Sequence, residues 1–265
     1  MSEKILKALL QLFAIIVKVD GSSSAGTSGS VAVSRFLRQQ FTLEQAMAHM
    51  AAFESFVLAF HSSGGASQKG RKRTSLNSVK VLKICAQVNE ELTQRQKFVV
   101  LVHLLELIHA GGEVGDQEQE FVSTVAESFN IASSEFQRCQ AFVLAGDERQ
   151  DMADILYIDA ANCADSSNSR HLHAHGLEGE MRVLNVPSVG LYLMRYQGND
   201  RVLLNGQSVI RDQAYVLSNG ASLRPPQGQP IYYSDILSSF LNGEGRDRLV
   251  FKADSIEFEF PNGRV

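Results

Sequence analysis

The sequence predicts an α+β protein of two domains, an all-helical domain followed by a small β-sandwich. All five prolines of the 265 residues lie at or after Pro187, and only one lysine, Lys252, lies beyond residue 150. Before that point apolar residues recur at helical spacing, and after it short β-rich runs meet Asn-Gly turns. We therefore expect a helical domain over 1–148 and a β-sandwich over 152–248.

Two N-terminal capping patterns indicate where helices of the first half begin. Thr42-Leu-Glu-Gln45 opens a helix that runs to about Phe60, and Thr93-Gln-Arg-Gln96 precedes the run 98–108. That run is apolar nearly all round, which predicts the central and most buried helix. With the other apolar stripes these patterns predict about seven helices. The other stripes cover 5–17, 121–129 and 133–144.

The second half contains short runs that are typical of strands. The runs 181–186 and 189–196 are rich in β-forming residues and predict two strands. Further runs flank Asn205-Gly206 and Asn219-Gly220, and Asn-Gly between apolar runs is the strongest short signal for a hairpin. Strands spaced this closely are typical of a small sandwich, and residues 232–241 add one short helix.

Composition excludes several classes of protein. The chain has 25 Lys and Arg against 29 Asp and Glu, a net charge of −4 and a pI near 6.0, which argues against a nucleic-acid binder. Its three cysteines form no CxxC, as in a reduced, intracellular chain. No apolar run reaches the roughly 18 residues that span a bilayer, and no signal-peptide cleavage site is present. We therefore expect a cytoplasmic chain without a transmembrane segment or a nucleic-acid partner.

Residues 62–74 predict a surface loop whose four cations are Lys69, Arg71, Lys72 and Arg73. Such a loop could hold an acidic lipid or a nucleic acid. No aromatic residue for base stacking lies among the cations, and this favours a solvated loop.

A helix, a turn, a second helix and an aromatic stop occur twice, at 13–41 and at 104–129. In the second copy, Ala110-Gly-Gly-Glu-Val114 followed by Gln117-Glu-Gln-Glu-Phe121 resembles the signature of the tellurite-resistance TerB family. The resemblance covers about residues 1–145 and implies an all-helical, internally duplicated domain. Acidic clusters in that family are associated with metal binding. Half of those carboxylates are replaced in this sequence, so the resemblance implies no metal site in the helical domain.

A second resemblance lies at the end of the sequence. Residues 251–265, with their alternating strand pattern and Asn262-Gly263 turn, resemble the first strand and turn of an ABC-type nucleotide-binding domain. No G-x-x-x-x-G-K-[ST] motif occurs in the chain. The resemblance implies that 249–265 begin an ATPase domain whose ATP and Mg would be bound further downstream. It also implies a large bacterial ABC transporter protein at the cytoplasmic side of the inner membrane.

The stretch 202–223 weakly resembles a forkhead-associated (FHA) sandwich. Domains of that family read phosphothreonine through loops that include an Asn-Gly pair, so the resemblance implies that Asn205 and Gly206 contact a bound peptide. The Gly-Arg pair and the Ser-x-x-His of the family are not matched, and the resemblance therefore favours the fold over the phosphopeptide activity.

His171-Leu-His-Ala-His175 places three imidazoles on one face of a strand, because alternate residues share a side. Three histidines can hold zinc, so His171, His173 and His175 are the candidate metal ligands. An exposed strand face is the alternative, since no carboxylate is spaced to complete the site. On the central helix Glu106 and His109 form one E-x-x-H pair, whereas di-iron bundles need two, and a polar helix edge is favoured there.

No nucleophile motif surrounds any serine or cysteine, so the sequence predicts no catalytic residue and no cofactor in these residues. We expect a non-catalytic regulatory or interaction region of an ABC-type ATPase. Its partner would be another protein or its own downstream ATPase domain. Two alternatives stay open, a free-standing peptide-binding adaptor and a TerB-like, metal-responsive stress protein.

Overall fold

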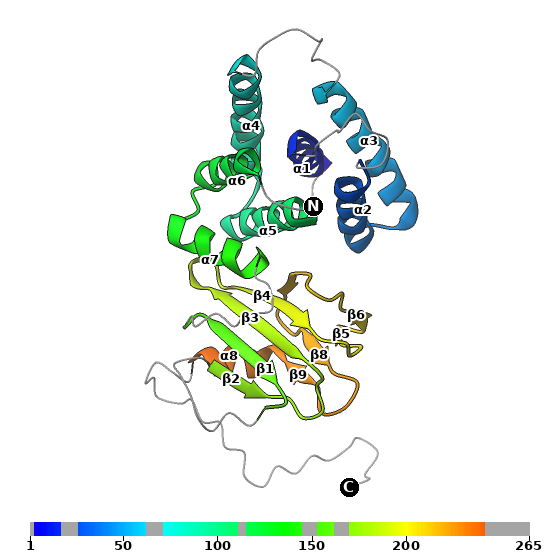
Figure 1. The fold of residues 1–265 in the computed structure, drawn as a ribbon, viewed down its shortest axis with the longest axis vertical. Coiled ribbons are helices and arrows are strands. Elements are labelled where there is room, and N and C mark those ends of the chain that lie inside the picture. The colour runs from blue at the N-terminus through cyan, green and yellow to red at the C-terminus, as the bar shows by residue number, and fades with distance from the viewer. Residues whose placement is uncertain are drawn as a thin grey trace, which may run out of the picture.

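The structure is a computed structural model that describes residues 3–16, 26–61, 71–110, 115–144, 153–161 and 170–241. In these residues seven helices precede the first strand and form the helical part of the molecule (Figure 1). They are α1 (Glu3–Ile16), α2 (Gly26–Gln40), α3 (Leu43–His61), α4 (Arg71–Glu91), α5 (Gln94–Ala110), α6 (Asp116–Ser128) and α7 (Ser133–Leu144).

The β part follows and contains two sheets and one helix. A five-stranded sheet has the order β2-β1-β3-β4-β7, and a four-stranded sheet has the order β6-β5-β8-β9. Only the β1–β2 pair is parallel among the described pairs. The elements are β1 (Ile155–Asp159), β2 (Arg170–His173), β3 (Glu180–Val186), β4 (Leu191–Gln197), β5 (Leu203–Leu204), β6 (Gln207–Ser208), β7 (Tyr215–Leu217), β8 (Ser222–Arg224), β9 (Ile231–Tyr232) and α8 (Tyr233–Leu241).

The capping patterns are confirmed at both predicted helix starts. The Thr93 amide donates to the Gln96 side chain at 2.9 Å, and the Gln96 amide donates back to the Thr93 hydroxyl at 3.4 Å. Thr42 and Gln45 form the same reciprocal pair before α3. These bonds satisfy amides that have no partner inside the helix, and they explain why the helices begin where the sequence indicated.

Helix α5 is the centre of the helical part, as its all-round apolar character predicted. Phe98, Leu101, Leu104 and Leu105 are each at most 1% exposed. Around it pack α1, α2, α6 and α7, and α1 also contacts α3 and α4. Such a helix is stable only when neighbours cover every side.

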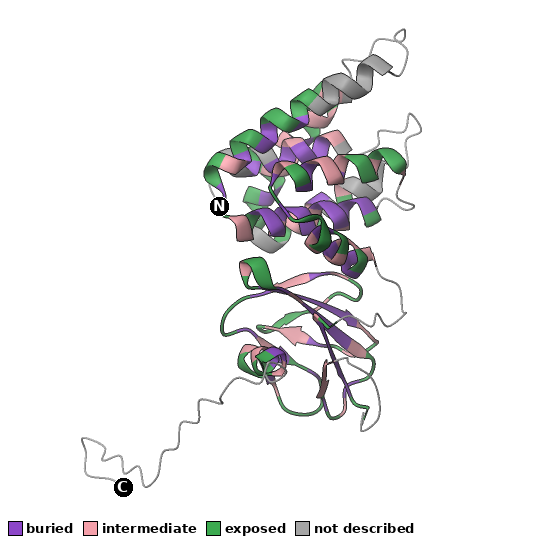
Figure 2. Cartoon of the chain, turned by 90° about the vertical axis from the view of Figure 1, so that its left-hand side faces the viewer, coloured by how far each residue is buried: buried purple, intermediate pink, exposed green. Residues whose placement is uncertain are grey.

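The five-stranded sheet has a core on each of its faces. Leu184 and Leu193 belong to the same hydrophobic cluster as the helices, while Val183 and Met194 belong to a second cluster. The second cluster also contains residues of β8, β9 and α8, so it lies between the two sheets. The alternation of side chains along a strand produces this division. Figure 2 shows the buried residues continuing from the helices into the strands.

Four details differ from the sequence prediction. Residues 71–74, predicted as loop, form the first turn of α4. The second strand begins at Leu191, because Pro187–Val189 form a 3-10 turn that ends at Gly190 with φ 56°. Strand β1 was not predicted, and β2 ends at His173, short of the strand over 171–175 that the three histidines indicated. The Asn219-Gly220 turn does not close a hairpin, since β7 pairs with β4 in one sheet and β8 with β5 and β9 in the other.

Residues 62–70 of the predicted basic loop and 251–265 of the ABC-like segment lie outside the described residues. Within the described part of the chain, no helix combines the length and the hydropathy that a bilayer-crossing segment needs.

Candidate binding groove between the helical and β parts

A glutamate on the central helix joins the two parts of the chain. The Glu106 carboxylate of α5 accepts a hydrogen bond of 2.8 Å from the Ala214 amide, which immediately precedes β7. Its second oxygen lies 3.2 Å from Nδ1 of His103, one turn earlier on α5. Glu106 is about one-fifth exposed. The carboxylate therefore fixes the entry to β7 against the helical core.

An arginine makes a second connection from the β side. Arg195 of β4 is 3% exposed, and its guanidinium donates to the carbonyl of Phe142 in α7 at 2.6 Å and to the carbonyl of Asp212 at 3.1 Å. Burial lowers the pKa of Arg195, and the Asp212 carboxylate 3.8 Å away opposes that shift. A planar guanidinium with several donors suits this role, because it can satisfy two carbonyls from different elements.

The edge of the junction carries two further links. Arg138 of α7 pairs with Asp154 just before β1. The Ser188 hydroxyl donates to the Glu135 carboxylate at 2.7 Å. With Glu106 and Arg195, these contacts place polar connections around the apolar cluster that both parts share.

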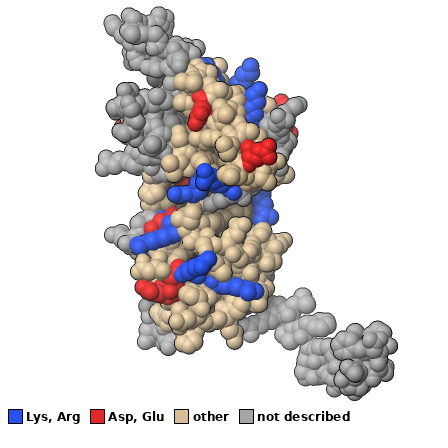
Figure 3. Space-filling model, turned by 90° about the vertical axis from the view of Figure 1, so that its right-hand side faces the viewer, with Lys and Arg blue, Asp and Glu red and all other residues tan. Residues whose placement is uncertain are grey.

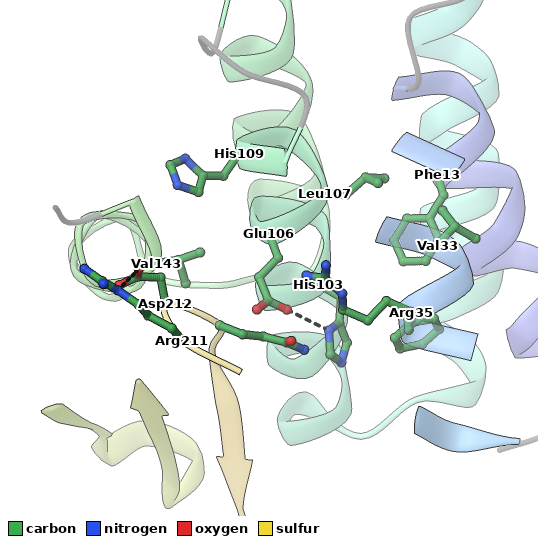
Figure 4. Close-up of a pocket in the computed structure, with 12 residues that line it drawn as sticks. Phe13, Val33, Arg35, His103, Glu106, Leu107, His109, Val143, Arg211 and Asp212 are labelled. Atoms are coloured by element: carbon green, nitrogen blue, oxygen red, sulfur yellow. Dashed lines mark hydrogen bonds and ion pairs between the residues drawn. The ribbon is translucent and has the colours of Figure 1, made fainter. Parts of the chain in front are cut away.

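Between the parts lies a first cavity of about 230 Å³, here called the inner pocket. Figure 4 shows Glu106 and His103 facing each other in it, with Arg35 reaching in from α2 and the Arg211–Asp212 segment on the other side. Asp212 pairs with Arg211 at 3.1 Å, and Glu106 accepts the Ala214 amide. The charges of the inner pocket are thus largely engaged with one another. The complete lining is Phe13, Val33, Arg35, Phe36, His103, Glu106, Leu107, His109, Val143, Arg211, Asp212 and Gln213.

A larger cavity of about 880 Å³, the outer groove, shares Arg35 and His103 with the inner pocket. One wall is α2 with part of α5, and the other comes from the β5–β6 hairpin and β7. Among its described lining residues there is no Asp or Glu. The lining is Val31, Ser34, Arg35, Arg38, Val99, His103, Leu204, Asn205, Gln207, Ser208, Ile210, Ala214, Tyr215 and Val216.

The charge of the outer groove comes from Arg35 and Arg38. Both side chains are exposed, and neither forms an ion pair with another residue that the structure describes. Figure 3 shows Lys and Arg side chains gathered at mid-height on this face, where the helices meet the strands. Two exposed cations over a cavity without carboxylates produce a local positive potential in a chain whose net charge is −4.

The predicted binding residues Asn205 and Gly206 lie at this groove. They form the turn between β5 and β6 with φ of 51° and 85°, as a two-residue hairpin turn requires. Asn205 lines the outer groove, and its side-chain oxygen accepts the Ser222 amide at 2.9 Å. The Asn205 side chain thus holds the hairpin to β8. Its contact with a peptide stays a prediction.

The three predicted zinc ligands have separate surroundings. His171 Nε2 lies 2.8 Å from the Asp159 carboxylate, and His173 Nδ1 lies 3.3 Å from the Ala161 carbonyl. The rings of His173 and His175 stack with centroids 6.5 Å apart. Within the residues that the structure describes, no three His, Cys, Asp or Glu side chains converge on a possible metal position. Zinc binding by these histidines stays a prediction.

Two acidic features of the helical part have structural explanations. The Glu118 carboxylate accepts the Gly115 amide at 2.8 Å, and Asp116 and Glu118 occupy the first turn of α6, where negative charge is favoured. The Glu106-to-His109 pair does not act together, since Glu106 bonds to Ala214 and His103 while His109 lies exposed at the inner pocket.

Sequence reasoning missed the groove cations Arg35 and Arg38 and the buried Arg195. Arg195 did leave a signal, because it interrupts a strand that is otherwise apolar on both faces, and it pairs in register with Arg182. Two arginines on the buried face of neighbouring strands indicate polar partners in the layer above. Arg35 and Arg38 left no such signal, since the sequence does not reveal that α2 and β7 face each other across the groove.

Comparison with known protein families gives a match to the family described as tellurite resistance protein TerB, over residues 6–141. This range covers the seven helices almost completely and ends before β1. Comparisons with curated proteins and with solved structures give no significant match.

Proposed function

The chain belongs to the tellurite-resistance TerB family, and from this premise we propose that it is a non-catalytic interaction region that binds a partner protein in the outer groove. The observation that carries the proposal is the construction of that groove. Its walls come from the TerB-type helices on one side and from the β part on the other. Neither part could form it alone.

The shared core supports this proposal. Glu106 and Arg195 hold the two parts in one arrangement, so the groove has a preformed shape in the free protein. A preformed site loses less conformational entropy when a partner binds. The lining mixes apolar, cationic and hydrogen-bonding side chains, which is the composition of a protein-binding surface.

We further propose that this region regulates an ABC-type ATPase and acts at the cytoplasmic side of the inner membrane. The support is the likeness of residues 251–265 to the start of a nucleotide-binding domain. In this proposal the described residues need no cofactor, and ATP and Mg belong to the downstream domain. The weak FHA likeness of 202–223 supports a peptide rather than a small molecule as the ligand.

The reading frame downstream of Val265 tests the ATPase assignment. A G-x-x-x-x-G-K-[ST] motif within about fifty residues is the expected result. A reading frame that stops at Val265, or that continues without this lysine, would contradict the ATPase assignment and leave the interaction proposal standing.

A display experiment tests the interaction proposal. A random peptide library is selected on the intact chain, and the enriched peptides are then measured on a variant whose groove is blocked by Gln207→Trp, at an exposed position of the lining. Peptides that bind the intact chain and lose binding in the variant are the expected result. The Asn199→Trp variant, altered at an exposed position outside the groove lining, is the matched control. Selection of no groove-dependent peptide would overturn the proposal.

A further inference from the structure

The outer groove has a free sheet edge along one wall. Strand β7 is the last strand of the five-stranded sheet and pairs only with β4 among the described strands. Ala214, Tyr215 and Val216 line the groove. Backbone amides and carbonyls at such an edge can pair with an added strand. No backbone hydrogen bond between described residues joins β7 to the β5–β6 hairpin, so the edge is not closed from that side.

Apolar side chains flank this edge. Val31 on α2 is 53% exposed and Ile210 is 42% exposed, and both line the groove. Leu204 and Val216 are half-buried beside them. A single exposed apolar residue is ordinary, but several around one cavity indicate an interaction site.

The opposite wall presents the two cations that form no ion pair with a described residue. Arg35 and Arg38 are three residues apart on α2, so they share one face of the helix with Cβ atoms about 5–6 Å apart. In an extended peptide, side chains on one face recur every second residue, a spacing of about 6.6 Å. Carboxylates at alternate positions of a strand on the β7 edge therefore match the two guanidinium groups.

From these three observations we propose that the outer groove binds an extended segment of the partner protein with acidic side chains on one face and apolar side chains on the other. The segment pairs with β7 as an added strand, its acidic face meets Arg35 and Arg38 on the helical side, and its apolar face meets Tyr215 and Leu204, which pack against the second cluster. This inference rests on the proposed function and names the class of peptide that the groove accepts.

A peptide fits this groove better than a nucleic acid. The described lining has two aromatic rings. His103 packs against Phe36 and lies 3.2 Å from Glu106, and the Tyr215 hydroxyl accepts the Ile210 amide at 2.8 Å. Single-stranded nucleic acids bind through several stacking aromatics and an extended row of cations. The outer groove has neither several stacking aromatics nor an extended row of cations.

The test uses a fluorescein-labelled peptide of alternating Glu and Val and the intact chain, with fluorescence anisotropy as the readout. The expected result is saturable binding that weakens as salt concentration rises. A matched peptide with Lys in place of Glu does not bind. A third peptide with Pro in place of the central Val binds much more weakly, because it lacks the amide that would pair with β7.

The charge contact is tested with the double variant R35E/R38E. Binding of the Glu-Val peptide is expected to weaken at least about tenfold, since two attractive contacts become repulsive. The double variant K80E/K83E is the control, because it reverses two exposed cations at the same spacing on α4, away from the groove. It binds like the original chain. R35Q/R38Q gives a second reading in case charge reversal disturbs the fold, which circular dichroism monitors.

Several outcomes would overturn the inference. The Glu-Val peptide could fail to bind, or the Lys-Val peptide could bind equally well. The Glu-Val peptide could also lose as much affinity for K80E/K83E as for R35E/R38E. Equal binding of the Pro-containing peptide would overturn strand addition. Competition by a single-stranded oligonucleotide that is stronger than the unlabelled peptide would assign the groove to nucleic acid. If the display experiment enriches groove-dependent peptides without acidic residues, this inference fails while the proposed function stands.

Discussion

The Glu106 carboxylate on α5 accepts a 2.8 Å hydrogen bond from the backbone amide of Ala214, a residue 108 positions further along the chain. The bond connects the centre of the helical core to the first residue before β7. Strand β7 belongs to one wall of the outer groove, and α2 and α5 form the opposite wall. The contact therefore fixes the position of one wall relative to the other. The shape of the candidate site therefore depends on a carboxylate that also stabilises the junction.

Replacing Glu106 with Ala is expected to lower the free energy of unfolding by about 1–3 kcal/mol, because the half-buried Ala214 amide loses its acceptor. Glu106→Gln is expected to cost less, since the side-chain oxygen of Gln still accepts a hydrogen bond. Urea unfolding followed by circular dichroism measures both values. Glu120→Ala, at an exposed position on α6, is the control. A Glu106→Ala protein as stable as this control would show that the bond contributes nothing.

The shared core predicts that the two parts unfold together. The chain has no tryptophan, and all six tyrosines lie after residue 150, so tyrosine fluorescence reports on the β part. Far-UV circular dichroism reports mainly on the helices. Urea transitions measured with the two probes are expected to coincide, as in a single cooperative unit. Two separate midpoints would mean that the parts unfold independently and that the junction is weak.

Cys85 and Cys139 are expected to resist thiol reagents in the folded protein. Both are buried, and burial raises the pKa of Cys85 to about 11 and that of Cys139 to about 12, so the reactive thiolate is scarce at pH 8. In a Cys163→Ser variant, Ellman's reagent is expected to detect no thiol before urea is added and two afterwards. Rapid reaction of either thiol without urea would contradict this burial.

The same two thiols predict a loss of stability at alkaline pH. Their pKa values in the folded state are raised above the ordinary value of 9.0, so the unfolded chain loses these protons first. Their contribution is complete below pH 9 and falls as pH rises toward 11 and 12, by at most about 1.4 kcal/mol per pH unit for each thiol.

Urea midpoints between pH 8 and 10 measure this loss. Burial also raises the pKa of Tyr192, Tyr196 and Tyr215, which adds to the same trend. The Cys139→Ala variant separates the thiol contribution, because its stability should fall less steeply with pH than that of the original chain. An unchanged slope in this variant would assign the whole effect to other groups.

Much of the fold could be predicted from local sequence patterns. The capping pairs at Thr42 and Thr93 and the all-round apolar run of α5 were read correctly, because helix starts and burial depend on residues close in sequence. The turn at Asn219-Gly220 was misread as a hairpin. Its residue types suit a hairpin, but Asn219 does not take the positive φ that Asn205 has, and the strands on either side pair with distant partners in different sheets.

The candidate groove could be predicted only in part. Asn205 and Gly206 were selected because their turn leaves a local signal, and the structure places Asn205 in the groove lining. Arg35 and Arg38 could not be selected, since their importance depends on a β hairpin that lies about 170 residues later and packs nearby. Long-range packing of this kind is not visible in residue spacing.

The continuity of the first core also bears on how this gene can evolve. Its apolar layer includes Ile155, Leu184 and Leu193 of the strands as well as the helices. A recombination event near residue 150 would leave that layer uncovered on both products and expose them to aggregation. We therefore expect selection against recombination products that separate these helices from the strands that follow them.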